Sequence, residues 1–346
     1  MNFRLFLLPF SLIYGSAVFL RNKLFDFAVF KETKFPVSII SIGNITTGGT
    51  GKTPHIEYLL KLLSTDKNVA TLSRGYGRKT RGFLYVNKNA KAEIVGDEPL
   101  QLKTKFSDAV VSVCESRVIG IEQILKDNPD TSVVLLDDAF QHRQVKAGIS
   151  ILLLDYGKIF KPDFLLPAGN LREQFSSKKR ADIIVVTRCP LLLQDSERMK
   201  VIEKISATEN QKVFFSSMVY AEKIESVFGS DKIALTKNTS TLLVTGIADA
   251  SGINAYTETK TKLEKHLEFN DHHKFSNADI KSIIEIFSTI AAGNKIILTT
   301  EKDAMRMKHE EKLKTLPLYY LPIEVRFPEN DAEKFNKLIT DYVGKN

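Results

Sequence analysis

The chain has 346 residues, 43% hydrophobic and 26% charged, a composition typical of globular proteins and a length sufficient for two domains. Its net charge of +8 favours an anionic partner, which could be a nucleotide, a nucleic acid or an anionic lipid. The two cysteines, Cys114 and Cys189, fit no metal-ligand spacing. Their apolar surroundings predict buried free thiols in a reducing compartment.

An uncharged apolar run, LFLLPFSLIYGSAVFL, covers residues 5–20 and is flanked by basic residues. It is shorter than the ~20 residues of a spanning helix, and Pro9 interrupts it. Three interpretations remain open: a cleaved signal peptide with YGSA as the cleavage site, a packed core helix, and a helix lying in the membrane interface. The basic flanks and the apolar continuation LFDFAVF favour an anchor on an anionic leaflet, so residues 1–34 are predicted to be a membrane-associating helical region.

From residue 37 onward, short runs rich in Val, Ile and Leu alternate with helical patterns. Such runs are typical of strands that are buried on both faces of a parallel sheet. The alternation predicts a doubly wound α/β domain. The expected strands are residues 37–42, 68–72, 109–113, 132–136, 149–154 and 183–187.

A second α/β unit follows this domain. The segments TLLVTGIAD (241–249) and KIILTTEKD (295–303) are expected strands that end in polar turns. Between them we expect a helix capped by Asn277 and stopped by Gly293. The polar, lysine-rich residues 221–240 are the expected hinge between the two units.

The stretch SIISIGNITTGGTGKTPHIEYLL (38–60) predicts a phosphate-binding loop. A strand, a glycine-rich turn and a helix that opens at Lys52 let backbone N–H groups and the helix N-terminus hold phosphate oxygens. The Walker A pattern has glycine where this chain has Thr46, but Gly48 and Gly49 keep positive φ available. Lys52 is expected at the outer phosphates and the Thr53 hydroxyl at Mg²⁺. The predicted nucleotide-binding residues are Thr46, Thr47, Gly48, Gly49, Thr50, Gly51, Lys52 and Thr53.

Two adjacent carboxylates, Asp137 and Asp138, follow the expected strand 132–136 in SVVLLDDAFQHR. Ligands bind at the carboxyl edge of an open parallel sheet. Adjacent acids after a strand can also cap a turn. The phosphate loop upstream favours Mg²⁺ binding by this pair.

Weaker signals lie elsewhere in the chain. In VGDEP (95–99), Asp97 could accept the proton of an attacking hydroxyl, although Gly-Asp-Glu-Pro is also an ordinary turn. In EFNDHHKF, His272 and His273 could bind metal, handle protons or lie in a solvated loop. Two basic clusters, one containing Arg74 and the other Arg172, suit phosphate oxygens or ordinary surface solubility. The sequence has no aromatic interleaving and no recognition motif, so nucleic acid is a poor fit.

Taken together, the motifs resemble those of tetraacyldisaccharide 4′-kinase, the lipid A pathway kinase of Gram-negative bacteria. They are GNITTGGTGKTP (43–54), SRGYGR (73–78), VGDEP (95–99), LLDDAFQHR (135–143), LPAGNLRE (166–173), TGIAD (245–249), NDHH (270–273) and TTEKDA (299–304), in the order of the family. The loop of that family is itself an atypical Walker A. One difference is Asn270, where a proline is expected before the Asp–His pair.

The resemblance implies a P-loop kinase core (35–225), a smaller α/β domain (226–346) and an N-terminal helix at the cytoplasmic face of the inner membrane. It implies Mg²⁺-dependent transfer of the γ-phosphoryl group of ATP to the 4′-hydroxyl of a tetraacylated glucosamine disaccharide 1-phosphate, which yields lipid IVA. It assigns roles by motif position: Asp97 as general base assisted by His272 or His273, Lys52 and Arg172 at the phosphates, Glu98, Arg117 and Arg74 at the substrate, and Thr53, Asp137 and Asp138 at Mg²⁺.

Two alternatives belong to other functional classes. A regulatory P-loop GTPase should carry Asn/Thr-Lys-x-Asp for guanine, but the nearest string, TEKD, has its lysine and aspartate adjacent; a regulatory ATPase lacks such a test. The other alternative is a membrane-associated ATP-binding module without small-molecule chemistry. The sequence predicts no oligomeric state.

Overall fold

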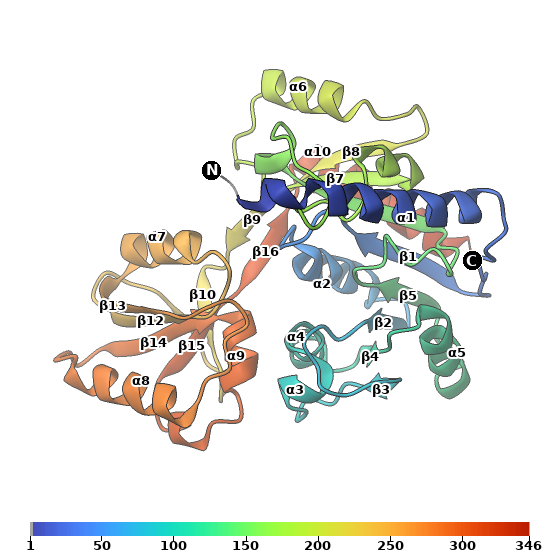
Figure 1. Ribbon diagram of the computed structural model, residues 1–346. Coiled ribbons are helices and arrows are strands. Elements are labelled where there is room, and N and C mark those ends of the chain that lie inside the picture. The colour runs from blue at the N-terminus through green and yellow to red at the C-terminus, as the bar shows by residue number, and fades with distance from the viewer. Residues whose placement is uncertain (1–2, 346) are drawn as a thin grey trace.

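The larger domain is built on an eight-stranded sheet, within a computed structural model that describes residues 3–345. Its strands are β1 (Ser38–Gly43), β2 (Val69–Ser73), β3 (Leu84–Tyr85), β4 (Val110–Val113), β5 (Val133–Leu136), β6 (Ile149–Asp155), β7 (Ile183–Thr187) and β8 (Lys212–Phe215). They are ordered β3-β4-β2-β5-β1-β6-β7-β8, and only β3 pairs antiparallel with its neighbour (Figure 1). All six strands expected here occur, and the doubly wound class is confirmed.

Helices cover both faces of this sheet because successive strand residues point to opposite sides. Ile40 and Ile42 of β1 belong to a core shared with α2 (Lys52–Leu63), α4 (Asp97–Lys105) and α10 (Glu329–Gly344). On the other side, Ile39 packs with α5 (Arg117–Asp127), and β6 and β7 pack with α6 (Asp195–Ile205). The short α3 (Ala92–Val95) precedes α4, and short 3₁₀ helices occupy Tyr156–Lys158 and Phe175–Arg180. The helices cover the two faces of the sheet and leave the carboxyl ends of its strands uncovered, and the phosphate loop follows β1 at that edge.

The smaller domain has a six-stranded sheet. Its strands are β10 (Lys223–Ser226), β11 (Lys232–Ala234), β12 (Ser240–Thr245), β13 (Lys262–Glu268), β14 (Lys295–Thr300) and β15 (Leu318–Leu321), ordered β11-β10-β15-β14-β12-β13. Its helices are α7 (Ser251–Lys260), α8 (Asn277–Thr289) and α9 (Glu301–Met307), with a 3₁₀ turn at Glu311–Leu313. The cap of α8 is Ser276, in a capping box with Asp279, and the helix ends before Gly293; both limits differ slightly from the expected ones.

A two-stranded ribbon joins the domains, and the boundary expected from the sequence needs two corrections. The ribbon pairs β9 (Ser217–Tyr220) antiparallel with β16 (Ile323–Arg326), whereas the expected hinge, residues 221–240, lies in the smaller domain and includes β10 and β11 of its sheet. The C-terminal α10 was assigned to the smaller domain, but it packs on β8 and α2 of the larger one (Figure 1). Its apolar face, including Phe335, finds its partners there, a long-range match that local patterns do not reveal.

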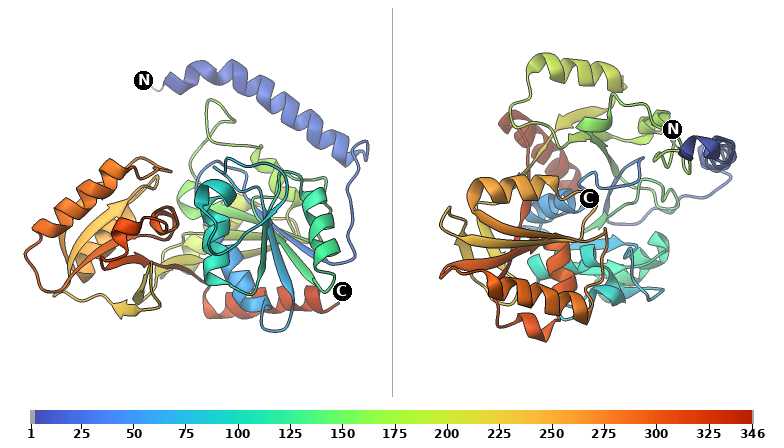
Figure 2. Two further views of the ribbon diagram at one scale, coloured as in Figure 1. Left: turned by 90° about the horizontal axis from the view of Figure 1, so that it is seen from below. Right: turned by 60° about the vertical axis from the view of Figure 1, so that its left-hand side comes forward.

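The N-terminal helix lies on the outside of the larger domain (Figure 2). A 3₁₀ turn, Phe3–Leu7, leads into α1 (Leu8–Asp26), so Pro9 opens the α-helix rather than interrupting it. By length and composition, residues 4–26 could cross a membrane. Only 6% of an apolar 18-residue stretch within them is buried inside the protein. This exposure excludes the packed core helix.

The polarity of α1 is inverted relative to a helix that packs on a soluble core. Its protein-facing side carries Ser11, which donates to Leu165 O, and Tyr14, which donates to Arg172 O. The outward side carries large exposed apolar side chains, among them Phe10, Leu12, Ile13, Phe19 and Leu20. Polar groups therefore attach the helix to the protein, and the apolar groups face away from it.

Candidate active site

The phosphate loop connects β1 to α2 and reaches its shape without a glycine at residue 46. Thr47 N donates to Asn170 O (2.7 Å) and Arg172 N donates to Ile45 O (2.8 Å), so Thr46 pairs with Leu171 like a strand residue. Positive φ occurs at Gly48 (94°) and Gly51 (85°) but not at Gly49. The first Walker glycine is dispensable here because the LPAGNLRE segment holds the loop from outside.

Polar side chains from the core fix the remainder of the loop. Asn44 Nδ2 donates to Thr50 Oγ1 (2.8 Å), and the Thr187 hydroxyl donates to Thr50 O (2.9 Å). Lys158 Nζ and Arg188 Nη2 lie 3.9 Å and 3.4 Å from where side chains at Gly48 and Gly49 would begin. The sequence reasoning missed both cations; their position at the ends of β6 and β7, beside the loop strand, is the signal that could have indicated them.

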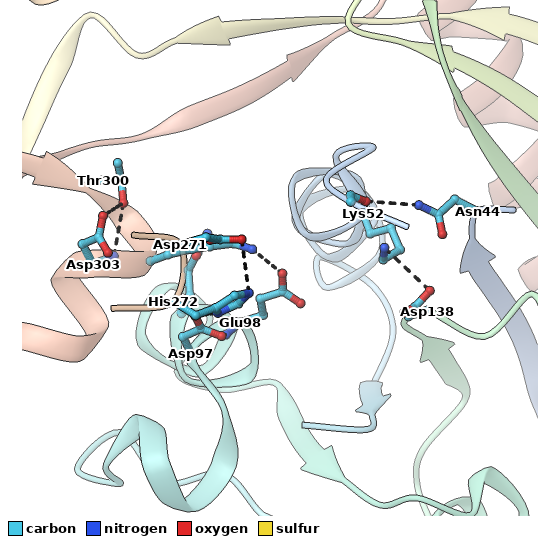
Figure 3. A network of polar contacts seen from close by, with 12 residues as sticks. Asn44, Lys52, Asp97, Glu98, Asp138, Asp271, His272, Thr300 and Asp303 are labelled. Carbon is cyan, nitrogen blue, oxygen red and sulfur yellow. Dashed lines mark hydrogen bonds and ion pairs between the residues drawn. The ribbon is translucent and has the colours of Figure 1, made fainter. Parts of the chain in front are cut away.

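Lys52, Asp138 and Arg172 come together beside the loop. Lys52 Nζ lies 3.6 Å from Asp138 Oδ1 (Figure 3). Arg172 Nη1 donates to both Asp138 oxygens (2.8 and 2.9 Å). Burial alone would raise the pKa of Asp138, but the charges of Lys52 and Arg172 outweigh it and lower that pKa. Two cations therefore flank one ionised carboxylate where the outer phosphates of a nucleotide would lie.

Asp137 lies deeper and has a different environment. Burial and the neighbouring carboxylates of Glu98 and Asp138 raise its pKa, against the charges of Lys52 and Arg117. Its Oδ1 is buried without a hydrogen-bond partner among the described residues. A buried carboxylate oxygen left without a donor suits a cation.

The residues present fit a magnesium ion. Thr53 is buried at the start of α2, and Asp137 and Asp138 supply oxygens at the end of β5. Residues 3–345 contain no group of three or more His, Cys, Asp and Glu side chains placed to hold a metal. Magnesium at nucleotide sites uses one or two carboxylates together with substrate phosphates, so a cage made only of protein ligands is not required.

Asp97 and Glu98 open α4 and face the smaller domain. Asp97 Oδ2 accepts a hydrogen bond from Arg306 Nη2, and Glu98 Oε1 accepts one from Lys302 Nζ. Lys302 and Arg306 are four residues apart on α9 and so lie on one face of that helix. Two acids of the core thereby meet two bases of the smaller domain. The adjacent acids of VGDEP therefore lie in the first turn of α4 and join the larger domain to the smaller one.

The two histidines of NDHH have separate environments. His272 lies beside Asp97, with its Nδ1 3.6 Å from Asp97 Oδ2 (Figure 3). Its backbone is left-handed (φ 57°), and its ring lies against Tyr76. His273 instead contacts Asp279 Oδ2 through Nε2 (3.0 Å) and stacks on Phe269. The structure thus brings His272, and not His273, to Asp97. Asn270, where a proline was expected, still forms the turn, with its carbonyl accepting from His273 N.

Opposite pKa shifts distinguish Asp97 from His272. Burial alone would raise the pKa of Asp97, but His272, Arg306 and Lys302 outweigh it and hold that pKa well below its usual range. The contact with Asp97 raises the pKa of His272, against burial and the charge of Arg306. The carboxylate is 7% exposed and the imidazole 41% exposed.

Gly246 links three of the sequence motifs. Its N–H donates to Asp303 Oδ2 (2.9 Å), and its carbonyl accepts from Arg306 Nη1 (2.9 Å) and from His272 N (3.1 Å). A Cβ at this position would lie 3.1 Å from Asp303 Oδ1 and from His273 Cβ. TGIAD, NDHH and TTEKDA thus interlock around one peptide group, which explains why strand ends so far apart in the chain carry them.

The remaining expected substrate residues differ in accessibility. Arg117 is 2% exposed and donates to Cys114 O (2.6 Å) and Asp137 O (3.1 Å), so it holds the backbone of the Asp137 turn and has no access to a substrate in this arrangement. Arg74 is exposed at the end of β2. Glu98 is tied to Lys302. Both cysteines are buried and free, as expected.

Comparison with known proteins shows the family and the fold of the chain. A profile of the tetraacyldisaccharide-1-P 4′-kinase family matches residues 3–343. The tetraacyldisaccharide 4′-kinase of Phocaeicola vulgatus is 43% identical over 350 residues, covering 98% of this chain and 95% of that protein. The enzyme of that name from Flavobacterium psychrophilum is 44% identical over 346 residues, covering 99% and 98%.

A solved structure shares the fold. It is a crystal structure described as an "apo" form of LpxK from Aquifex aeolicus in complex with ATP, with a TM-score of 0.78, 30% sequence identity, and coverage of 98% of this chain and 99% of that chain. Sequence and fold agree over nearly the whole length. The chain therefore belongs to the tetraacyldisaccharide-1-P 4′-kinase family.

Proposed function

We propose that two groups of side chains share the reaction of this protein, an ATP-dependent lipid A kinase that phosphorylates the 4′-hydroxyl of a tetraacylated disaccharide 1-phosphate. One group, around the phosphate loop, holds ATP. The other, at the contact between the domains, receives the proton of the sugar hydroxyl. The observation that supports this division is the meeting of Asp97 from the core with His272 from the smaller domain, on the side of the sheet that carries Lys52.

The phosphate group of residues positions the γ-phosphoryl group. The loop N–H groups and the N-terminus of α2 bind phosphate oxygens, and Lys52 with Arg172 supplies positive charge. Thr53, Asp137 and Asp138 would hold Mg²⁺, which when bound neutralises charge on the phosphates. Because Lys52 and Arg172 both pair with Asp138, a phosphate bound beside them would share both cations with that carboxylate.

For the proton acceptor we propose His272 rather than Asp97, which the motif positions had favoured. Asp97 is buried against Arg306 and its pKa is held low, so it is a weak base. His272 is more accessible and its pKa is raised, so it takes a proton more readily. His272 would receive the hydroxyl proton, and the negative charge of Asp97, 3.6 Å from Nδ1, would stabilise the imidazolium that forms. The dissociative character of phosphoryl transfer makes no demand for a stronger base.

We propose that the protein binds the anionic lipid leaflet on the cytoplasmic side of the inner membrane, where ATP is present. The outward face of α1 is apolar, and the partly exposed Lys23 supplies positive charge on the same helix, whereas Arg4 and Arg21 bond to the larger domain. Phe160 and Phe164 are exposed in the segment that precedes Leu165, and Leu165 touches α1. An apolar surface of this kind would place the active site beside a lipid substrate.

Phosphate transfer from radiolabelled ATP to the tetraacylated disaccharide 1-phosphate in mixed micelles tests this function. Lys52→Ala should abolish transfer, and His272→Ala should lower kcat by roughly 10²- to 10⁴-fold while ATP still stabilises the protein to heat. His273→Ala is the matched control, since that ring contacts Asp279 and not Asp97, and it should keep most of the activity. Full activity of the Lys52 variant would refute the kinase assignment, and full activity of the His272 variant would refute the base.

A further inference from the structure

Arg306 contacts residues of both domains, and the proposed reaction gives it no role of its own. Its Nη1 donates to Gly246 O (2.9 Å) and Asp303 Oδ1 (2.7 Å). Its Nη2 donates to Asp97 Oδ2 and lies 3.1 Å from His272 Nδ1. The side chain is only 9% exposed. One guanidinium therefore touches both members of the proton-acceptor pair.

The anchor of Arg306 is rigid. Asp303 is fully buried, and its Oδ2 accepts from Gly246 N (2.9 Å) and the Thr300 hydroxyl (2.7 Å), which leaves Oδ1 for Arg306. Thr300 is also the N-cap of α9. The planar fork of arginine thus has one edge fixed in the smaller domain, and the other edge points at the core.

Arg306 and His272 meet the same oxygen. Asp97 Oδ2 accepts from Arg306, and His272 Nδ1 stands 3.6 Å from it, beyond hydrogen-bond length. The nearby Nη2 can only donate, so it opposes a proton on Nδ1. The electrostatic stabilisation of protonated His272 by Asp97 therefore depends on the position in which Arg306 holds Asp97 Oδ2.

We propose that Arg306 is a positioning residue of the phosphoryl transfer: anchored by Asp303, it holds Asp97 against the smaller domain and, by sharing Asp97 Oδ2 with His272, sets how strongly His272 binds a proton. This inference rests on the proposed function, because it requires His272 to be the acceptor. It adds a residue of α9, which lies 209 positions from Asp97 in the chain.

Other charges around His272 are few, so the effect of Arg306 can be isolated. Asp271 Oδ2 lies 3.9 Å from Nε2, and the uncharged ring of Tyr76 covers one side. Asp97, Arg306 and Asp271 are the charges that act on the His272 pKa, while Lys302 acts on Asp97, and Asp97 and Arg306 act on Asp303. Removing Arg306 takes away the positive charge nearest to the imidazole.

The experiment compares Arg306→Gln with Arg306→Lys by two readouts, the His272 pKa from imidazole NMR signals and the pH profile of kcat/KM for the lipid. Arg306→Gln should raise the His272 pKa by roughly one unit, since a nearby like charge is lost. It should lower kcat/KM about tenfold or more, because Asp97 is no longer fixed, with KM for ATP unchanged. Arg306→Lys keeps the charge but not the fork, so the pKa should stay near that of the wild type while kcat/KM falls.

Arg198→Gln is the matched control. Arg198 forms a two-pronged pair with Asp331 (2.6 and 2.7 Å) on the far side of the core, so its loss should lower the melting temperature without moving the pH profile. An Arg306→Gln protein with wild-type His272 pKa and wild-type kcat/KM would overturn the proposal. If that variant does not fold, wild-type kcat/KM in Arg306→Lys would overturn it instead. Full activity of His272→Ala would remove the acceptor itself, a separate failure that belongs to the proposed function.

Discussion

The imidazole of His272 and the carboxylate of Asp97 are neighbours, but their surroundings give them opposite tendencies to bind a proton. Asp97 is enclosed with Arg306, whereas His272 stands on a left-handed turn at the edge of the contact. An imidazole is ordinarily a stronger base than a carboxylate, and the charges around this pair widen that difference by lowering the pKa of Asp97 and raising that of His272.

The pH dependence of activity should report His272. Its pKa is raised above the ordinary value of about 6.5, so kcat/KM should fall as the pH drops through that raised pKa and level off above it. His272→Gln should remove this limb and leave a flat, low profile. Steady-state rates across the range in buffers of constant ionic strength provide the measurement, and an unchanged limb in the variant would contradict the assignment.

The contribution of His272 to stability should change with pH in the direction opposite to its contribution to activity. A pKa that is higher in the folded than in the unfolded protein adds stability below the unfolded value of about 6.5, and this stability disappears as the pH rises through the folded pKa. The difference in melting temperature between wild type and His272→Gln should therefore be largest in mild acid and shrink in alkali. Thermal denaturation followed by circular dichroism at several pH values measures it; a difference that grows with pH would be inconsistent.

Gly246 is a second test at the level of one residue. A methyl group there would stand 3.1 Å from Asp303 Oδ1, and that oxygen is held by Arg306 and cannot retreat. Gly246→Ala should cost roughly 1–3 kcal/mol of stability by overpacking and reduce lipid phosphorylation, while ATP affinity is retained. Chemical denaturation and nucleotide titration separate the two effects; Gly293→Ala, where a methyl group would meet open space, is the control.

The sequence predicted residues whose partners are local and left open those whose partners are remote. Lys52, Thr53 and the two aspartates after β5 could be identified because a loop and a strand edge define them. The choice between His272 and His273 depends on a left-handed backbone at residue 272, and both Arg306 and the burial of Arg117 depend on contacts made across the fold. Arg306 could have been suspected from its spacing of four from Lys302, opposite two adjacent acids.

At the level of elements, α10 shows how one helix can be assigned to the wrong domain. It follows the smaller domain in sequence, yet Asp331 in its first turn accepts from Phe215 N (3.1 Å) and pairs with Arg198. Phe335 then stacks on Phe327 and meets Tyr58 of α2. Its amphipathic pattern predicts a helix with one buried face but not which domain covers that face.

The attachment of α10 gives a prediction about stability. Asp331→Ala leaves Arg198 and a buried N–H of β8 without their acceptor, so it should lower the free energy of unfolding by roughly 2–4 kcal/mol. Because the site is distant, KM for ATP at low temperature should be unchanged. Urea denaturation with parallel kinetics would measure both, and a loss below about half a kilocalorie would contradict the assigned role.

For the molecule as a whole, the ribbon and the outer helix set how substrate and nucleotide meet. Gly51, the last loop residue before Lys52, lies against Met218 of β9: a Cβ there would stand 1.8 Å from Met218 Cε. The phosphate loop thus touches the ribbon that carries the smaller domain. The phosphate loop and the smaller domain, which carries His272, are therefore both in contact with the ribbon.

The outer face of α1 gives a prediction at this scale. Replacing Phe10 and Ile13 with serine should reduce binding to vesicles that contain phosphatidylglycerol, since two exposed apolar side chains are lost. Activity on substrate dispersed in detergent should change little. Vesicle flotation measures binding, and Ile119→Ser, an exposed apolar residue on α5, is the control. Equal flotation of the wild type and the double variant would contradict a lipid-facing α1.

The pairing of Tyr220 with Ile323 in the ribbon has a consequence for how this chain could be rebuilt. Everything between these two residues leaves the core and returns to it at neighbouring points, so the smaller domain is an insertion whose ends already touch. Replacing the segment between these two junctions with that of a relative would join a different smaller domain, with its own proton acceptor, to an unchanged phosphate loop. A two-residue turn such as Asn-Gly at the same place would instead close the ribbon into a hairpin. The proposed nucleotide-binding residues thus lie in one domain, and the proposed proton acceptor lies in a domain inserted into it.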